Sequence, residues 1–301
     1  MPSRFRGPLV ASSSTHAERA PADILSRIGL PAQRVIHIDF TNEANHVANA
    51  AGSQLMTPVG NGFGATPAPT IAAARRTSAP FSGLTTLQLT PSDANNEGTQ
   101  LVWGTPGGGA GVAADGFGLG TALASFGSEP CTAFYNSIWG FRSAGSDHTG
   151  GVFAFGFMAH DGVAANCVLD TAGAAQTTIH GAYLRYVGAA SIECVSVGSL
   201  ASLSTTVALT GGATPALVET SHYLSAVRME WNGLSATGAG LGSISFYHGL
   251  RTGPIRRIAQ HSMTTLGAMN GLAPGVCGVR VSAAVIIEIA GIMCATTVPV
   301  I

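Results

Sequence analysis

The sequence has no lysine and little charge of either sign. All 14 basic residues are arginine, and charged residues make up 10% of the 301 positions. Soluble globular domains usually carry roughly 25%. The absence of lysine excludes a P-loop, a Schiff-base enzyme and a lysine general base. A weakly charged surface tends to associate, so the composition predicts a subunit of an assembly and not a free monomer.

The charge pattern also argues against nucleic acid and membrane partners. The formal net charge is -1, and no basic run is longer than Arg75-Arg76 or Arg256-Arg257, so the electrostatic footprint of a DNA- or RNA-binding protein is missing. The longest apolar run, "AAVIIEIAGIM", is interrupted by Glu288 and is too short to cross a bilayer. The first 20 residues lack an apolar core, and we expect no signal peptide there.

The cysteines show no metal-binding or disulfide pattern. There are five of them, an odd number with no CxxC spacing: Cys131, Cys167, Cys194, Cys277 and Cys294. We expect buried thiols in a protein made in a reducing compartment. The sequence therefore predicts no metal and no cofactor, and it contains neither a nucleophile elbow nor a dinucleotide fingerprint.

Three His/Asp pairs are the remaining candidates for polar chemistry. His37 and Asp39 are two apart in an alternating segment, so they share one face of a strand, a geometry that suits a metal site or a dyad. A solvated or interfacial face is the commoner use of such a pair, and we favour it. Asp147-His148 and His160-Asp161 are direct neighbours, which point to opposite faces of a strand or serve as polar groups in turns.

Hydrophobic alternation predicts an all-β protein. Residues 1–33 contain too few apolar residues to bury themselves, and we interpret them as an N-terminal arm with one or two helical turns. From "RVIHIDF" at Arg34 onward, about a dozen β-rich runs alternate with turn residues up to "VRVSAAVIIEIAG". Residues 44–80 are loop-like, with "TIAAARR" as a candidate short helix. We predict one antiparallel β-sandwich domain, a jelly roll, over residues 34–301.

The stretch "AVRMEWNGLSATGAGLGSISFYHG" predicts two strands joined by a loop over Asn232–Gly242. Val227, Met229 and Trp231, with Ile244 and Phe246, fall on one face and are expected in the core; Arg228, Glu230, Ser243, Ser245 and Tyr247 fall on the other.

Other aromatic residues are also expected in the core. Phe153, Phe155 and Phe157 alternate, which favours a packed face over a sugar-stacking platform. Trp103 and Trp139 are expected there too. The glycine-rich segment Gly104–Gly120 fits a plain loop and a subunit contact equally well.

The order "SAVRMEWNG", loop, "GSISFYHG" and final "VIIEIAGI" resembles the second half of concanavalin-like and laminin-G-like jelly rolls. With "RFRGP" and "RVIHIDFTN" near the start, it also resembles structural proteins of tailed bacteriophages. The resemblance covers residues 34–295 and implies the fold and a capsid decoration (cement) role. The glycosidase pattern Glu-x-Asp-x-x-Glu is missing, since Glu193, Glu230 and Glu288 each stand alone. We therefore expect no enzyme, no catalytic residue and no clustered calcium ligands.

The leading hypothesis is accordingly a phage capsid decoration protein on the exterior of the virion, made in the host cytoplasm. Its expected partners are the major capsid protein and further copies of itself, with a trimer as the first expectation for the homo-oligomer. The alternative is a carbohydrate-binding module of a tail or head fibre, which has a glycan as its ligand.

Overall fold

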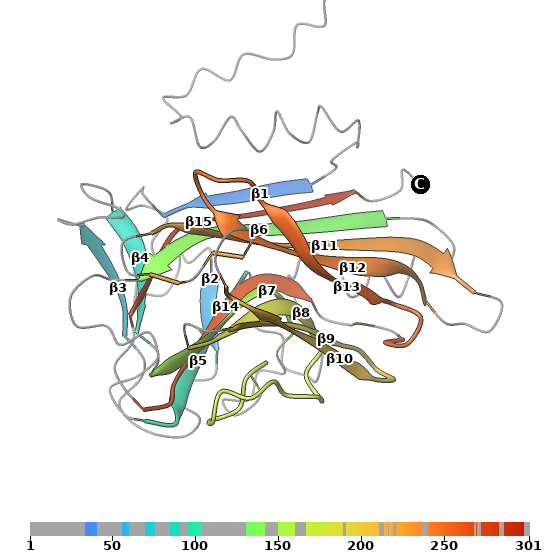
Figure 1. Cartoon of the computed structure of the whole chain (residues 1–301), viewed down its shortest axis with the longest axis horizontal. Helices are drawn as coiled ribbons and strands as arrows, with labels where there is room; N and C mark the ends of the chain where they lie inside the picture. Colours follow the sequence, from blue (N-terminus) through green and yellow to red (C-terminus); the bar gives the residue numbers. More distant parts are fainter. Residues whose placement is uncertain are drawn as a thin grey trace, which may run out of the picture.

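The computed structural model describes sixteen stretches of the chain. These are residues 34–40, 56–59, 70–75, 85–90, 95–103, 131–141, 150–159, 167–188, 191–210, 214–215, 217–218, 221–235, 240–267, 269, 272–282 and 286–297. They form two antiparallel sheets that lie one above the other (Figure 1). The all-β, antiparallel sandwich expected from the alternation is confirmed.

The upper sheet in Figure 1 has eight strands. Its order is β13-β12-β11-β6-β15-β4-β3, and β1 also pairs with β15. The strands are β1 (Arg34–Asp39), β3 (Thr70–Arg75), β4 (Thr85–Thr90), β6 (Cys131–Phe141), β11 (Tyr223–Leu234), β12 (Gly240–Leu250), β13 (Arg256–Ser262) and β15 (Ile287–Thr297). The most C-terminal strand, β15, thus lies inside the sheet, between β6 on one side and β4 and β1 on the other.

The lower sheet has seven strands in the order β10-β9-β8-β7-β14-β5-β2. They are β2 (Met56–Val59), β5 (Glu97–Trp103), β7 (Gly151–Met158), β8 (Gly181–Val187), β9 (Ser191–Val197), β10 (Ser202–Ala208) and β14 (Ala273–Arg280). Within the described chain no helix is long and apolar enough to cross a membrane.

The core between the sheets is built from the residues that the alternation assigned to it. Val227, Met229 and Trp231 are at most 3% exposed, and Ile244 and Phe246 are fully buried. Trp139 lies at the centre, stacked on Phe155 with ring centroids 4.7 Å apart and in edge contact with Tyr186. Phe153 and Phe157 belong to the same cluster. The side chain of Trp103 lies outside the described part.

The hairpin between β11 and β12 is tighter than the sequence suggested. The strands continue to Leu234, which pairs with Gly240, after a register shift between Trp231 and Leu234. The connection therefore comprises residues 235–239 and not Asn232–Gly242. A side chain at Gly240 would place its Cβ 2.3 Å from the Trp231 ring. Because glycine has no Cβ, the backbone at this end of the hairpin can pack directly against the indole.

Two further expectations were wrong. Residues 56–59 and 70–75 form β2 and β3 where the sequence suggested loops and, in "TIAAARR", a helix. Ile71 and Ala73 pair with Leu89 and Leu87 of β4, and this pairing decides the conformation of a segment too short to nucleate a stable helix by itself. The predicted arm (1–33), Gly104–Gly120, Asp147-His148 and His160-Asp161 lie outside the described residues, and the 34–301 domain boundary stays a prediction.

The centre of the lower sheet, at β7 and β14, is buried on both faces, which the alternation did not predict. Every residue of β7 is buried. Phe153, Phe155 and Phe157 face the inter-sheet core, while Ala154 and Met158 belong to a second apolar cluster on the outer side. That second cluster is closed by residues 167–180, which we call the cover segment and which run below the lower sheet in Figure 1.

Candidate interface on the eight-stranded sheet

The cover segment is fixed to the lower sheet by hydrogen bonds at its start. Gln100 of β5 is fully buried; its amide Nε2 donates to Ala159 O (3.0 Å) and its Oε1 accepts from Val168 N (2.9 Å). Tyr183 OH donates to Val168 O at 3.1 Å. Beneath these bonds the Cys167 and Cys277 thiols touch, and burial raises the pKa of the Cys277 thiol well above its usual value. This part of the sheet is therefore closed to a ligand.

A charged group holds the middle of the cover segment. Arg185 Nε donates to Gly173 O at 2.6 Å, and its Nη1 forms an ion pair with Glu193. Ser204 Oγ donates to the other oxygen of Glu193 at 2.5 Å. Gly173 has φ 77°, a left-handed turn that suits glycine. Glu193, which stands alone in the sequence, is thus a structural partner for Arg185.

One buried Ser–His arrangement resembles part of a hydrolase site, but its surroundings differ. Ser196 Oγ lies 2.9 Å from His261 Nδ1, and Thr205 Oγ1 lies 3.0 Å from His261 Nε2. A catalytic triad has a carboxylate where Thr205 stands, and it presents its serine to substrate, whereas Ser196 is 0% exposed. The three side chains come from β9, β10 and β13, so they join the two sheets at their shared edge.

A second polar group joins the sheets in the middle of the core. Ser225 Oγ accepts from Trp139 Nε1 at 2.7 Å and lies 2.5 Å from Tyr186 OH, which in turn lies 3.1 Å from His248 Nδ1. Burial lowers the pKa of His248 to about 4 and raises that of Tyr186. Both groups are therefore neutral at pH 7, which suits an apolar interior.

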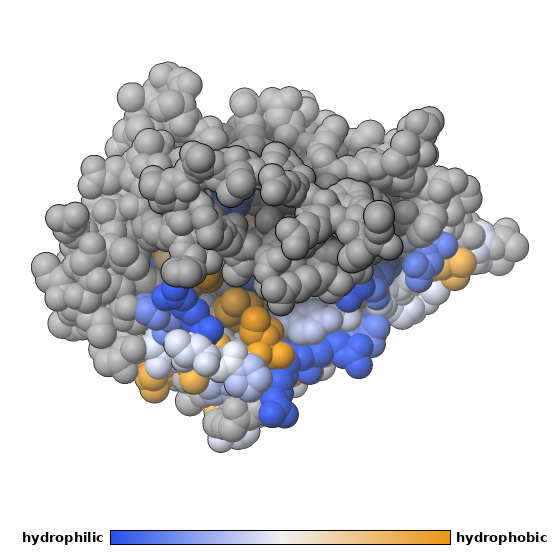
Figure 2. Space-filling model, turned by 90° about the horizontal axis from the view of Figure 1, so that it is seen from above, coloured by the Kyte–Doolittle hydropathy of each residue, from blue (hydrophilic) through white to orange (hydrophobic). Residues whose placement is uncertain are grey.

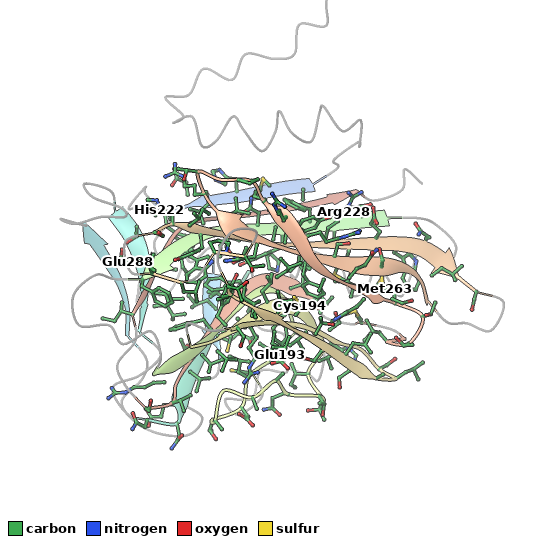
Figure 3. All side chains as sticks on the ribbon, viewed as in Figure 1. Glu193, Cys194, His222, Arg228, Met263 and Glu288 are labelled. Carbon is green, nitrogen blue, oxygen red and sulfur yellow. The ribbon has the colours of Figure 1, made fainter. Side chains whose placement is uncertain are left out.

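The three carboxylates that stand alone in the sequence are also apart in space. Glu193 belongs to the lower sheet, and Glu288 lies far from Arg228 and its neighbour Glu230 in the upper one (Figure 3). Glu230 pairs with Thr132 and Glu288 with Gly140, at opposite ends of β6. These β6 positions are about 26 Å apart at ~3.3 Å per residue, too far for the paired carboxylates of a glycosidase.

The outer face of the upper sheet is the broad surface that remains. Strand register arranges its side chains in rows that cross β1, β15, β6, β11, β12 and β13. One row is His37, Met293, Asn136, Ala226, Tyr247 and Arg257. The next is Ala295, Phe134, Arg228, Ser245 and Gln260. We call these eleven residues the outer face.

The outer face carries few charges. Its small or apolar members Ala226, Ser245 and Met293 are buried, with 2%, 4% and 6% of their surface exposed. Arg228 Nη2 lies 2.5 Å from Glu230 Oε1, so the two central charges cancel. Asn136 Oδ1 and Arg228 Nε have no hydrogen-bond partner within the described chain. Figure 2 looks down on this side of the molecule; the coloured residues visible along its margin are mostly hydrophilic, around a small hydrophobic patch.

His37 and Asp39 share a side of β1, as the spacing predicted. Their cross-strand neighbours on β15 are Met293 and Gly291, neither of which supplies a metal ligand. No group of three or more His, Cys, Asp or Glu residues suited to a metal ion occurs in the ranges that the structure describes. The pair therefore belongs to an ordinary surface, and His37 is part of the outer face.

The sequence pointed to only part of this surface. It assigned Arg228, Glu230 and Tyr247 to the open side of their strands, and this is confirmed. It did not single out Asn136 or Phe134, although "TAFYNSIW" alternates and so placed both opposite Tyr135. What was missing was the neighbour relation between β6 and β11, which are some ninety residues apart in sequence.

Comparison with known proteins reveals similarity of structure only. The chain matches no known protein family, and no characterised protein resembles it in sequence. Among solved structures, an alginate lyase from Aplysia kurodai is 10% identical over 89% of this chain and 100% of its own, with a TM-score of 0.49. Peanut lectin in complex with a nine-residue peptide is 12% identical over the same shares, with a TM-score of 0.46.

A third similar structure is the lectin UEA-II complexed with galactose, 11% identical over 89% of this chain and 100% of its own, with a TM-score of 0.47. The similar proteins thus include lectins and an enzyme. At these identities and TM-scores, the likeness transfers no ligand, metal or reaction to this chain. The resemblance to phage decoration proteins stays a prediction.

Proposed function

We propose that this chain is a structural protein that acts by docking and not by a chemical reaction. The observation that carries the proposal is the outer face: a surface six strands wide whose central arginine, Arg228, pairs with Glu230. A surface of this kind gains affinity from area and shape, as do stable protein interfaces. The buried Ser196–His261 pair and the separated carboxylates support the same view, since neither offers a reactive group to a substrate.

The assembly that we propose is the capsid of a tailed bacteriophage, with the major capsid protein as partner. Two features support this choice: the weak charge of the whole chain and the resemblance of "RFRGP" and "RVIHIDFTN" to phage structural proteins. A protein that binds across the junctions of a shell adds interface energy to the closed particle, so it stabilises that particle by mass action.

The experiment is a binding assay on purified particles that lack this protein. Wild-type protein is added, bound and free fractions are separated by sedimentation, and copies per particle are counted. Tyr247→Arg places an unpaired charge on the outer face and is expected to lower the bound fraction at least tenfold. Thr171→Arg, on the exposed cover segment at the other side of the sandwich, is the matched control and should bind as wild type does.

Two results would contradict the capsid proposal. One is wild-type protein that does not sediment with particles. The other is particles that resist heat equally well with and without it. Equal loss of binding in Tyr247→Arg and Thr171→Arg would show that the contact does not lie specifically on the outer face.

Glycan binding is the second candidate, favoured by one observation. Of the aromatic side chains whose burial the structure gives, only Phe134 and Tyr247 are partly exposed. Both lie on the outer face, on strands that flank β11, two residues out of line, and so about 12 Å apart. Between them stand the side chains of Arg228 and, next to Phe134 on β6, Asn136. Aromatic faces beside planar polar groups suit a sugar ring.

A glycan array distinguishes the two candidates. If a sugar is the ligand, wild-type protein binds a defined subset of glycans and Tyr247→Ala loses that signal, while Thr171→Ala keeps it. An array without signal for the wild type eliminates this candidate and leaves the docking proposal to the particle assay.

A further inference from the structure

The two sheets present five edge strands in the described chain: β1, β3 and β13 in the upper sheet, β2 and β10 in the lower. An edge strand exposes unpaired N–H and C=O groups, which readily pair with another chain. Soluble proteins block such pairing with charges, proline, register irregularities or short strands. A long edge without these devices is therefore a site where a further strand is expected.

Four of the five edges are protected. β2 has four residues, one of which is Pro58. β3 ends at Arg75, and β1 carries Arg34 and Asp39. β13 begins with Arg256 and Arg257, both exposed, and its pairing with β12 shifts register between Phe246 and Tyr247.

The edge strand β10 has no such protection. Its seven residues, "SLSTTVA", contain no charge and no proline, and its register with β9 is continuous. None of the seven is buried, and five of them are exposed. Leu200, in the turn that leads into β10, is 73% exposed, so the apolar surface continues beyond the strand.

We propose that β10 pairs antiparallel with β10 of a second copy of this chain, so that two seven-stranded sheets become one continuous sheet. A two-fold axis at Thr205 places Leu203 opposite Val207 of the other copy and Ser204 opposite Thr206. Apolar residues then meet apolar residues and hydroxyls meet hydroxyls, with no like charges facing each other. Cross-strand pairs of these types stabilise antiparallel sheets, and joining at an edge is a common mode of strand recognition.

The interior side of β10 is already organised for this pairing. Leu203 packs against the inter-sheet core, and Thr205 is held by His261. On the other side, Ser204 is held by Glu193. The strand therefore meets a second copy with little further loss of conformational entropy, which lowers the cost of association.

Sedimentation velocity on the full chain, compared with Thr206→Lys, tests the proposal. Thr206 is exposed and lies beside the proposed axis, so the two ammonium groups would lie diagonally across the axis on the same side of the joined sheet, and a lysine on an edge strand blocks pairing with another strand. We expect wild-type protein at twice the 30.3 kDa chain mass and the variant at the single mass, with an unchanged thermal midpoint. Gln260→Lys, an exposed position on β13, is the matched control and should remain dimeric.

A cross-linking variant checks the register. Ser204→Cys/Thr206→Cys should give a reducible covalent dimer under mild oxidation, whereas Ser262→Cys on β13 should not. A wild-type chain that stays monomeric, an odd-numbered oligomer, or an oligomer that Gln260→Lys splits and Thr206→Lys does not would each overturn the proposal. None of these outcomes depends on whether the outer face binds a capsid or a glycan.

Discussion

His248 and His261 show how single residues join the two sheets. Each projects from the upper sheet toward a hydroxyl of the lower one, Tyr186 and Ser196 respectively. Both are buried, and burial lowers the pKa of each. A neutral imidazole is both donor and acceptor, so it fits between hydroxyl groups without bringing charge into the interior.

The stability of the protein should therefore fall as the pH falls below neutrality. The pKa of His248 is about 4 when folded and about 6.5 when unfolded, so the unfolded state binds more protons between these values and stability rises with pH there. The loss from pH 7 to pH 4 is about 3 kcal/mol for this residue. Urea unfolding of His248→Gln at pH 7, 6 and 5 should show a shallower pH dependence than wild type, whereas exposed His37→Gln should keep the full slope.

Ser225 is the second residue whose removal should be costly. Its hydroxyl satisfies both Trp139 Nε1 and Tyr186 OH in the core. Ser225→Ala leaves the Trp139 N–H and the Tyr186 hydroxyl, both buried, without that partner, which should lower the free energy of unfolding by about 2–4 kcal/mol. Ser245→Ala, one strand away on the outer face, should change it by less than about 0.5 kcal/mol. Equal effects of the two variants in urea titrations would contradict the role given to Ser225.

At the scale of elements, alternation predicted the long strands and failed at the short ones. The segment "AVRMEW" alternates apolar and charged residues, and β11 follows it. "TIAAAR" has no alternation, and only the neighbouring β4 makes it a strand. The segment "GVFAFGFM" also predicts burial of both faces of its strand, because neither face has a polar residue.

The cover segment should behave as a unit that opens separately from the sandwich. Gln100→Leu keeps the size of the side chain but removes both hydrogen bonds to residues 159 and 168. We expect faster amide exchange at Val168 and Gln176, with unchanged exchange in β11 and β12. Gln260→Leu, on the exposed edge of the other sheet, is the control. Uniformly faster exchange in both sheets would instead indicate global destabilisation.

For the molecule as a whole, low charge predicts how it associates. Charged residues are 10% of the chain, and the outer face carries a paired Arg228 and Glu230 at its centre. The dissociation constant of a contact made by such a surface should change by less than tenfold between 50 and 500 mM salt, since salt screens mainly the interactions between exposed charges. Sedimentation at the two salt concentrations measures this. A loss of a hundredfold or more would point to charged contacts outside the described residues.

The place of β15 sets the order in which the molecule is completed during synthesis. Residues 287–297 leave the ribosome after every other strand, yet they fill the gap between β6, β4 and β1. Until then neither β1 nor the β3–β4 pair has a strand linking it to β6, and the upper sheet exists as three unconnected parts. Nascent chains stalled before residue 287 should therefore stay sensitive to protease. The protease resistance of the folded protein should appear in one step, once β15 is free to insert.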